Sequence, residues 1–394
     1  MTQVRFKKAS TPYQPGACRL LASPKLICIL IKLKKIPRRL PLNPSHTADS
    51  LGRLEDLPAD YIADMTALSI APLWPQLRGL LPRGKPSRAT QPFVWHYKDV
   101  RPQLMRAGEL TPIEKAERRV LVLCNPGHGI EKLVATPNIY VGMQLILPGE
   151  VAPNHRHTPS AVRFVVEGEG GFTTVQGEKC PMHKGDLILT PAGLWHEHGH
   201  EGQGPVVWMD ALDLPMVYGM DASYAIEGPS QNASPDLDAS QTKYQRAGLV
   251  PFSSLSQSVR APYPQIRYPW VDVRKALLAL DQGTAKDDAV QLAYVNPETG
   301  APCLPTLGFS AQLLRDGLDF SPRRRSASSV MHVIEGHGES EIDGVTLKWS
   351  EGDTVAIPTH AQIKHRASNG QAYLFHVDDA PTQRALGFYQ EFSA

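Results

Sequence analysis

Two histidine-containing motifs constrain the fold of this chain more than any other feature. The first reads Gly149-Glu-Val-Ala-Pro-Asn-His155-Arg-His157, and the second reads Gly185-Asp-Leu-Ile-Leu-Thr-Pro-Ala-Gly193-Leu-Trp-His196-Glu-His198. Side chains alternate between the two faces of a strand, so His155 and His157 project from one side and Arg156 from the other. His196 would arrive from a second strand. We therefore predict a facial metal site formed by His155, His157 and His196, with open coordination positions.

A purely structural role for these histidines is the competing interpretation. A lone histidine in a barrel is usually a hydrogen-bonded core residue, but three at this spacing, with glycines and a proline setting the turns, favour metal binding. Three neutral imidazoles suit Fe, Zn, Cu or Ni about equally by ligand type. A site without a carboxylate ligand would keep its full 2+ charge and attract an anionic, bidentate substrate.

The pattern G-x5-H-x-H followed by G-x5-P-x-G-x2-H resembles the two signature motifs of the cupin superfamily, whose members are double-sheet jelly-roll barrels. Many cupins carry a glutamate ligand shortly after the second histidine, where this chain has Ala161 and Val162. The resulting three-histidine variant resembles gentisate 1,2-dioxygenase and its salicylate and 1-hydroxy-2-naphthoate relatives. That resemblance implies Fe(II) as the cofactor. It also implies cleavage of gentisate by O2 between the carboxyl-bearing and hydroxyl-bearing carbons, to give maleylpyruvate.

An internal repeat predicts two barrels. Gly149 matches Gly317 and Gly168 matches Gly336 at an offset of 168, and Gly352-Asp-Thr-Val-Ala-Ile-Pro358 repeats Gly185-Asp-Leu-Ile-Leu-Thr-Pro191. The ligand positions of the second copy hold Arg323, Arg325 and Ile363, which cannot bind a divalent metal. We predict an all-β-dominated bicupin with flanking helices, in which only the first jelly-roll barrel is a metal site.

The remaining patterns divide the chain into five regions. Apolar spacing predicts helices over about 51–81, broken by Pro72 and Pro75, and over 99–107; Ser, Pro, Gln and Asn are frequent in 226–266, and a helix is expected over 272–280. The expected regions are a basic extension (1–48), a helical region (49–117), the catalytic barrel (118–225), a linker with a helix (226–300) and the degenerate barrel (301–394). Residues 1–48 carry ten Lys or Arg and no acid, which fits a targeting peptide or a disordered or non-native extension.

Strand alternation from His157 places Arg163 on the inward face, near the metal. A buried arginine needs an anionic partner because an isolated buried charge costs several kcal/mol. Glu167 or Asp210 could supply that partner internally. The other interpretation is that the guanidinium receives a substrate carboxylate through two parallel hydrogen bonds, and the dioxygenase resemblance favours it.

The resemblance also implies roles for residues around the predicted metal. His198, on the same strand face as His196, would contact the substrate and handle a hydroxyl proton, and Arg118 would bind the carboxylate alongside Arg163. Tyr140, Gly142 and Gln144 would line the pocket; Tyr140 replaces the Trp that relatives often have. Trp208 and Asp210 are equally compatible with a structural role.

Net charge and cysteine content limit the classes of binding partner that this chain is expected to have. The net charge is +2, so neither nucleic acid nor a membrane surface is indicated. The five cysteines, Cys18, Cys28, Cys124, Cys180 and Cys303, are scattered, which is typical of reduced thiols in a cytoplasmic protein. The expected partners are an aromatic hydroxy acid and O2, and the resemblance implies a homotetramer. Two alternatives stay open: dioxygenation of salicylate or 1-hydroxy-2-naphthoate, and a non-oxidative metal-binding cupin.

Overall fold

The computed structural model describes residues 51–231, 237–256 and 261–392. The predicted basic extension, 1–48, lies outside these residues. The chain divides into two compact units, 1–83 and 84–394, so the predicted helical region 49–117 is shared between them. No helix in the described ranges is long and apolar enough to cross a membrane.

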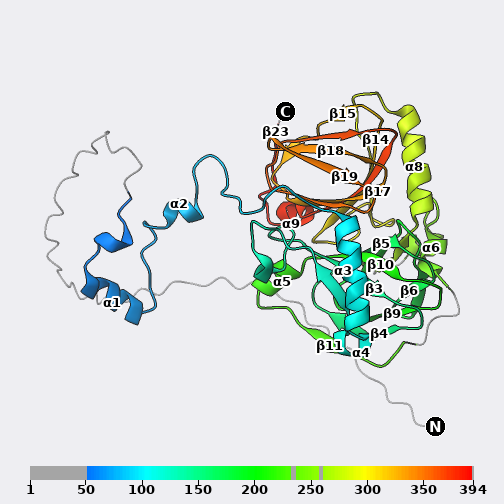
Figure 1. Cartoon of the computed structure of the whole chain (residues 1–394), viewed down its shortest axis with the longest axis horizontal. Coiled ribbons are helices and arrows are strands. Elements are labelled where there is room, and N and C mark those ends of the chain that lie inside the picture. The colour runs from blue at the N-terminus through cyan, green and yellow to red at the C-terminus, as the bar shows by residue number, and fades with distance from the viewer. Residues whose placement is uncertain (1–50, 232–236, 257–260, 393–394) are drawn as a thin grey trace, which may run out of the picture. The chain divides into compact units, whose positions relative to one another are not determined.

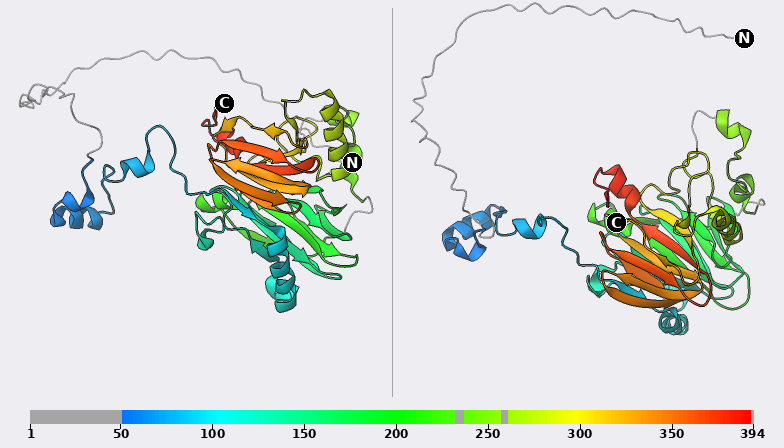
Figure 2. Two further views of the ribbon diagram at one scale, coloured as in Figure 1. Left: turned by 45° about the horizontal axis from the view of Figure 1, so that its top comes forward. Right: turned by 90° about the horizontal axis from the view of Figure 1, so that it is seen from above.

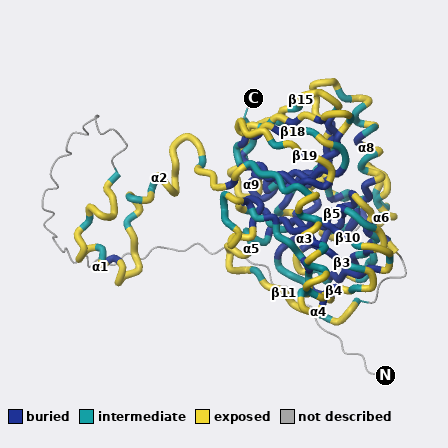
Figure 3. Tube along the Cα trace, in the orientation of Figure 1, coloured by how far each residue is buried: buried dark blue, intermediate teal, exposed yellow. Residues whose placement is uncertain are grey.

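The first unit has less helix than the sequence predicts. Instead of a helical run over 51–81, it contains a 3-10 turn at Leu54–Asp56, α1 (Ala59–Ala67) and the short α2 (Leu77–Leu80). Prolines explain the difference, because Pro58 starts α1 and the stretch with Pro72 and Pro75 cannot continue it. Met65 is the only buried residue described in this unit (Figure 3).

The first barrel consists of two antiparallel sheets. The six-stranded sheet runs β12-β8-β5-β10-β3-β2 and the five-stranded sheet runs β11-β4-β9-β6-β7 (Figure 1). The strands are β2 (Arg119–Val122), β3 (Tyr140–Ile146), β4 (Val151–His157), β5 (Ala161–Glu167), β6 (Gly171–Val175), β7 (Glu178–Pro181), β8 (Leu187–Thr190), β9 (His196–His200), β10 (Val206–Leu212), β11 (Ala225–Glu227) and β12 (Arg267–Tyr268).

The second barrel repeats this architecture. Its sheets run β1-β20-β17-β22-β14-β13 and β15-β21-β18-β19, with β16 and β23 as a separate pair. The strands are β1 (Phe93–Trp95), β13 (Val290–Ala293), β14 (Gly308–Leu314), β15 (Asp319–Phe320), β16 (Arg324–Arg325), β17 (Ser329–Glu335), β18 (His337–Ile342), β19 (Val345–Ser350), β20 (Thr354–Ile357), β21 (Ile363–Ala367), β22 (Ala372–Asp378) and β23 (Glu391–Phe392).

The two barrels pack against each other through the outer faces of their six-stranded sheets (Figure 2). Phe164 on β5 stacks on Phe375 on β22, with ring centroids 4.2 Å apart. Strand alternation then sends Ala161, Arg163 and Val165 toward the inside of the first barrel. The largest apolar cluster of the described residues thus lies between the barrels. Inside the first barrel a smaller apolar cluster that includes Val165 and Trp208 lies beside buried polar residues such as Arg163.

Each barrel also receives a strand from the other repeat. β1 joins β20 of the second barrel although the helix after it, α3 (Tyr97–Leu110), packs on the first; β12 joins β8 of the first barrel although α8 (Trp270–Gly283) packs on the second. Asp353 accepts a hydrogen bond from the Tyr97 backbone N–H, and Asp186 accepts one from the Trp270 N–H. The two repeats are therefore joined by hydrogen bonds at the first residue of α3 and at the first residue of α8.

The remaining elements are short. They are α4 (Ile113–Ala116), a 3-10 turn at Ile130–Lys132, α5 (Leu214–Gly219), α6 (Ala239–Lys243), α7 (Phe252–Ser256) and α9 (Ala380–Ala385). In its described residues, the region expected to be a linker, 226–266, therefore contains two short helices and contributes part of β11.

Candidate metal centre and substrate pocket

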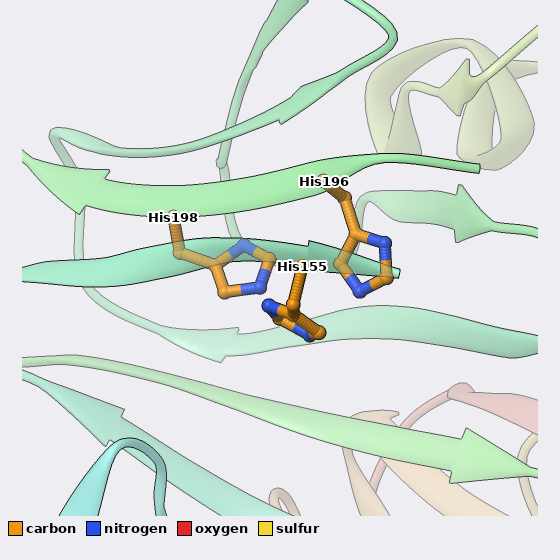
Figure 4. Close-up of side chains that lie close together, drawn as sticks. All are labelled: His155, His196 and His198. Atoms are coloured by element: carbon orange, nitrogen blue, oxygen red, sulfur yellow. The ribbon is translucent and has the colours of Figure 1, made fainter. Parts of the chain in front are cut away.

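The histidines of both motifs lie on adjacent strands of the five-stranded sheet. β4 and β9 are antiparallel, and His155 lies directly opposite His196. The β4–β9 register shifts between Ala152 and His155, so an irregularity precedes the H-x-H pair. Figure 4 shows His155, His196 and His198 with their rings turned toward one another from these two strands.

The three predicted ligands form a close set of rings. The ring centroids are 4.2 Å apart for His155 and His196, 4.8 Å for His157 and His196, and 5.6 Å for His155 and His157. In each ring the Nδ1–H donates to a backbone carbonyl two residues away: Pro153, Pro159 and Leu194 for His155, His157 and His196. These bonds fix the tautomer in which Nε2 carries the lone pair, the form that a metal requires.

His198 belongs to the same cluster. Ligand nitrogens of His155, His196 and His198 lie within 4.8 Å of one another, so the geometry brings His198 close to the centre as well as His157. The Nε2 atoms of His196 and His198 are buried and have no hydrogen-bond partner among the described residues. The unpartnered Nε2 of His196, facing the other histidine rings inside the barrel, fits a metal ligand, because a buried polar atom without any partner is costly. The Nε2 of His198 faces the same centre and is open to a metal or to a bound substrate.

The electrostatics keep these imidazoles neutral. Burial lowers the pKa of His155 to about 3 and that of His157 to about 4, and it lowers the pKa of His196 and His198 well below the usual value. The charges of Arg118 and Arg163 act in the same direction. Neutral imidazoles are the ligating form, so the site favours a cation bound by histidine over protonated histidine.

A pocket of about 280 Å³ opens beside the histidines. His155, His157, Arg118, Arg163 and Asp210 are among its lining residues. Arg163 is only 3% exposed, and its Nε forms an ion pair with Asp210 Oδ1 at 3.4 Å. Neither Nε nor Nη1 of Arg163 has a hydrogen-bond partner among the described residues. Glu167 is paired with Arg101 instead. Burial lowers the pKa of Arg163 to about 10, so the guanidinium remains charged at neutral pH.

Asp210 is the pocket's carboxylate. It is 7% exposed and accepts a hydrogen bond from Trp208 Nε1 at 3.0 Å. Burial raises its pKa to about 6, with Arg163, Trp208 and Arg118 opposing that rise. Trp208 itself is fully buried, and its ring lies under the Arg163 guanidinium at 5.8 Å. Trp208 therefore positions both charged groups, whereas Asp210 reaches the pocket.

The residues expected at the pocket from β3, and Arg118 directly before β2, have distinct places. Arg118, Tyr140 and Gln144 line it. Gly142 lies beneath the Tyr140 side chain, where a Cβ would come 2.9 Å from the Tyr140 hydroxyl oxygen and 2.4 Å from Val120 Cγ1. A glycine at 142 thus gives the Tyr140 ring room to fold back along its own strand.

One wall of the pocket could not be foreseen from the motifs. Leu214, Ser223, Tyr224 and Ala225 line it from the segment that leaves the first barrel. This segment returns as β11 and pairs with β4, with Ala225 opposite His157. The only signal in the sequence is the short apolar run Tyr224-Ala-Ile226, which is too weak to identify a strand.

Comparison with known proteins places this site in a family. A cupin domain model matches residues 142–212. A gentisate 1,2-dioxygenase from Ralstonia sp. is 52% identical over 342 residues, which cover 86% of this chain and 96% of that protein. The chain belongs to the gentisate 1,2-dioxygenase family. This confirms the family and the bicupin fold predicted from the histidine motifs and the repeat.

Other members of the gentisate 1,2-dioxygenase family share the fold and differ in named substrate. A 5-aminosalicylate 1,2-dioxygenase from Comamonas sp. is 38% identical over 83% of this chain and 88% of that protein. The crystal structure of salicylate 1,2-dioxygenase from Pseudoaminobacter salicylatoxidans with gentisate matches with a TM-score of 0.79 and 34% identity, covering 84% of this chain and 93% of that one. The chain is thus a dioxygenase with a histidine metal site.

Proposed function

We propose that this dioxygenase binds Fe(II) and cleaves the ring of gentisate with O2 to give maleylpyruvate. One observation carries the proposal. A single pocket is lined by His155 and His157, whose Nε2 lone pairs are fixed, and by two arginines, the buried Arg163 and the half-buried Arg118. The names of the relatives, gentisate 1,2-dioxygenase above all, support the substrate.

The donor set fits Fe(II). His155, His157 and His196 would hold the ion through Nε2, because each Nδ1 is already engaged with a carbonyl. Neutral nitrogen ligands on one side of an ion leave positions open on the other side. Bound Fe(II) would supply the redox chemistry with O2 that no side chain of this pocket can supply.

The arginines would hold the substrate's carboxylate. Arg163 is ion-paired with Asp210, but its Nε and Nη1 donate no hydrogen bond to any described residue, and Arg118 forms no ion pair in the described part of the chain. A carboxylate that receives parallel N–H bonds from a guanidinium is both bound and oriented. Asp210 is the one carboxylate among the described residues that line the pocket with Arg118 and Arg163. The negative charge of the substrate would therefore balance the second arginine.

Asp210 favours gentisate over salicylate. Its carboxylate lines the pocket and would accept a hydrogen bond from the second ring hydroxyl of gentisate, a group that salicylate lacks. Salicylate would leave this buried carboxylate without that donor, which costs binding energy. Dioxygenation of salicylate or 1-hydroxy-2-naphthoate remains the second candidate, because the salicylate and hydroxynaphthoate enzymes are relatives as well.

The test compares substrates on the iron-loaded protein. Purified protein is reconstituted with Fe(II) under anaerobic conditions and given gentisate, salicylate or 1-hydroxy-2-naphthoate, while O2 consumption and the ultraviolet absorbance of a ring-opened keto acid are recorded. We expect the highest kcat/KM with gentisate. If only salicylate or 1-hydroxy-2-naphthoate is turned over, that acid replaces gentisate as the proposed substrate. Absence of turnover with all three would reject the enzyme assignment in favour of a non-oxidative metal-binding cupin.

The same proposal includes a cytoplasmic homotetramer. Support for association comes from the first unit, where Leu68, Ile70, Leu73, Leu80 and Leu81 are all more than half exposed. Such a density of exposed apolar side chains is typical of surfaces that bind another protein. Size-exclusion chromatography with light scattering tests the tetramer; a monomeric mass would reject it.

A further inference from the structure

We infer that Thr173 and Met182, which lie outside the pocket, are positioning residues that fix the tautomer of His198. Both are buried, at 0% and 1% exposure. Thr173 lies directly opposite His198 on the β6–β9 ladder. The inference rests on the proposed function, because it assigns His198 a hydrogen-bond acceptor role toward the substrate.

The contacts of His198 leave one partner to decide its tautomer. Its Nδ1 lies 3.2 Å from Thr173 Oγ1. Its Nε2 points toward the histidine cluster (Figure 4) and has no hydrogen-bond partner in the part of the chain that the structure describes. A neutral imidazole carries its hydrogen on only one nitrogen. If Nδ1–H donates to Thr173, Nε2 offers a lone pair to the site; if the Thr173 hydroxyl donates to Nδ1, Nε2 presents an N–H.

Met182 decides between these two arrangements. Thr173 Oγ1 lies 3.8 Å from Met182 Sδ. A thioether sulfur accepts a hydrogen bond weakly and never donates one, so the Thr173 hydrogen can go to the sulfur. Thr173 Oγ1 is then left to accept from His198 Nδ1–H, and Nε2 carries the lone pair.

The second barrel contains the reverse arrangement. Ser340 and His365 occupy the positions of Thr173 and His198 at an offset of 167 and also face each other in register, with Ser340 Oγ 2.7 Å from His365 Nδ1. Trp349 stands at the position of Met182, and its Nε1–H donates to Ser340 Oγ at 2.8 Å. Because an indole only donates, the Ser340 hydrogen is free for His365 Nδ1. The barrel without metal ligands thus favours the tautomer with hydrogen on Nε2.

The difference between Met182 and Trp349 therefore has a functional meaning. In the barrel that holds the metal-site histidines, a sulfur acceptor replaces an N–H donor, and the histidine facing the site gains an acceptor nitrogen. With its lone pair toward the site, His198 Nε2 accepts a hydrogen bond from the substrate hydroxyl. With hydrogen on Nε2, the same ring would oppose that hydroxyl with a second donor.

The test uses three variants of the full chain. Thr173→Val removes the hydroxyl at nearly constant shape, Thr173→Ser retains it, and Met182→Leu removes the sulfur acceptor while conserving volume. Thermal unfolding and iron content identify any loss of fold or metal. We expect kcat with gentisate to fall about tenfold in Thr173→Val, with KM changed by less than about threefold, because one hydrogen bond at the reacting end is lost while the carboxylate contacts remain. Thr173→Ser should restore kcat, and Met182→Leu should lower it in the same direction.

The tautomer itself is read by nitrogen NMR. In zinc-loaded protein with ¹⁵N-labelled histidine, the His198 signals are identified by their loss in His198→Gln. We expect a protonated Nδ1 and an unprotonated Nε2 in the parent protein, and the reverse in Thr173→Val. A parent protein with hydrogen on Nε2, or a Thr173→Val variant with unchanged kcat and tautomer, would overturn the inference. If gentisate is not turned over at all, the proposed function fails, while the NMR result still decides the tautomer.

Discussion

His155 and His196 face each other across the β4–β9 ladder with their ring centroids 4.2 Å apart, and each Nδ1 is held by a carbonyl of its own strand region. Main-chain bonds therefore orient both rings before any metal binds. His155 and His196 belong both to the predicted ligand set with His157 and to the compact cluster with His198. Either His157 or His198 could therefore complete the metal site.

Metal content separates the roles of those two histidines. We expect His157→Ala to lose iron, because its Nδ1 bond to Pro159 O directs Nε2 as in the other two ligands. His198→Ala should keep close to the parent's iron and lose kcat, because among the described residues its ring bonds Thr173 alone, and its proposed contact is the substrate. Iron per chain, measured by mass spectrometry on dialysed protein, decides. Loss of iron from His198→Ala with retention in His157→Ala would exchange the two assignments.

Substrate affinity should depend on Arg163. Arg163→Lys keeps the charge but loses the planar pair of donors, so we expect KM for gentisate to rise about tenfold or more, the size of a lost charge-assisted hydrogen bond. Arg101→Gln is the matched control, because Arg101 pairs with Glu167 away from the pocket. Steady-state kinetics on both variants provide the measurement. An equal rise of KM in the control would remove the specific role of Arg163.

Selection of the substrate should depend on Asp210. Asp210→Asn keeps an oxygen for Trp208 Nε1 but removes the negative charge. We expect kcat/KM for gentisate to fall about tenfold, since hydrogen bonds to charged groups contribute roughly 1.5–3 kcal/mol, while the value for salicylate changes by less than about threefold. The ratio of the two values is the readout. A parallel fall for both substrates would mean that Asp210 acts only by orienting Arg163.

Acid should destabilise the protein through its buried histidines. Burial lowers the pKa of His332 to about 3, compared with about 6.5 in an unfolded chain. The stabilisation from keeping it neutral is complete above about pH 6.5 and is lost as the pH falls toward 3, because only the unfolded state then binds the proton.

The variant His332→Phe tests this dependence. It should be less stable than the parent at pH 7, because His332 Nδ1 bonds Thr354 Oγ1. Its unfolding free energy should decline less steeply below pH 6, by about 1.4 kcal/mol per pH unit for one proton. Urea unfolding of metal-free protein at pH 7 and pH 5 measures both slopes, with the exposed His337→Ala as control. Identical slopes for His332→Phe and the parent would contradict the assignment.

The sequence predicted the strands that carry the site because their signals are local. Alternation around His155 and Arg163 and the turn glycines of both motifs depend on neighbouring residues only, and β4, β5 and β9 carry His155, Arg163 and His196 as strand residues. The predicted helix over 99–107 is α3, and the helix over 272–280 is α8, each longer at both ends.

The remainder depends on contacts distant in sequence. Nothing near Phe93 indicates that β1 will pair with β20 of the other repeat, and nothing near Tyr224 indicates that it will line the pocket. The proximity of His198 to His155 depends on the β4–β9 register and its shift, which no spacing rule gives. Periodicity over 51–81 overestimated helix because prolines interrupt it.

The fate of labelled oxygen tests the proposed cleavage of gentisate by O2 most directly. Iron-loaded protein is given gentisate under ¹⁸O2, and O2 consumed, gentisate consumed and the mass of the product are measured together. Ring cleavage by a dioxygenase predicts one O2 per gentisate and a ring-opened maleylpyruvate with one label retained in its new carboxylate; the second label enters the keto group, whose oxygen then exchanges with water. A product without label, an intact ring, or no O2 consumption with any of the three aromatic acids would contradict it.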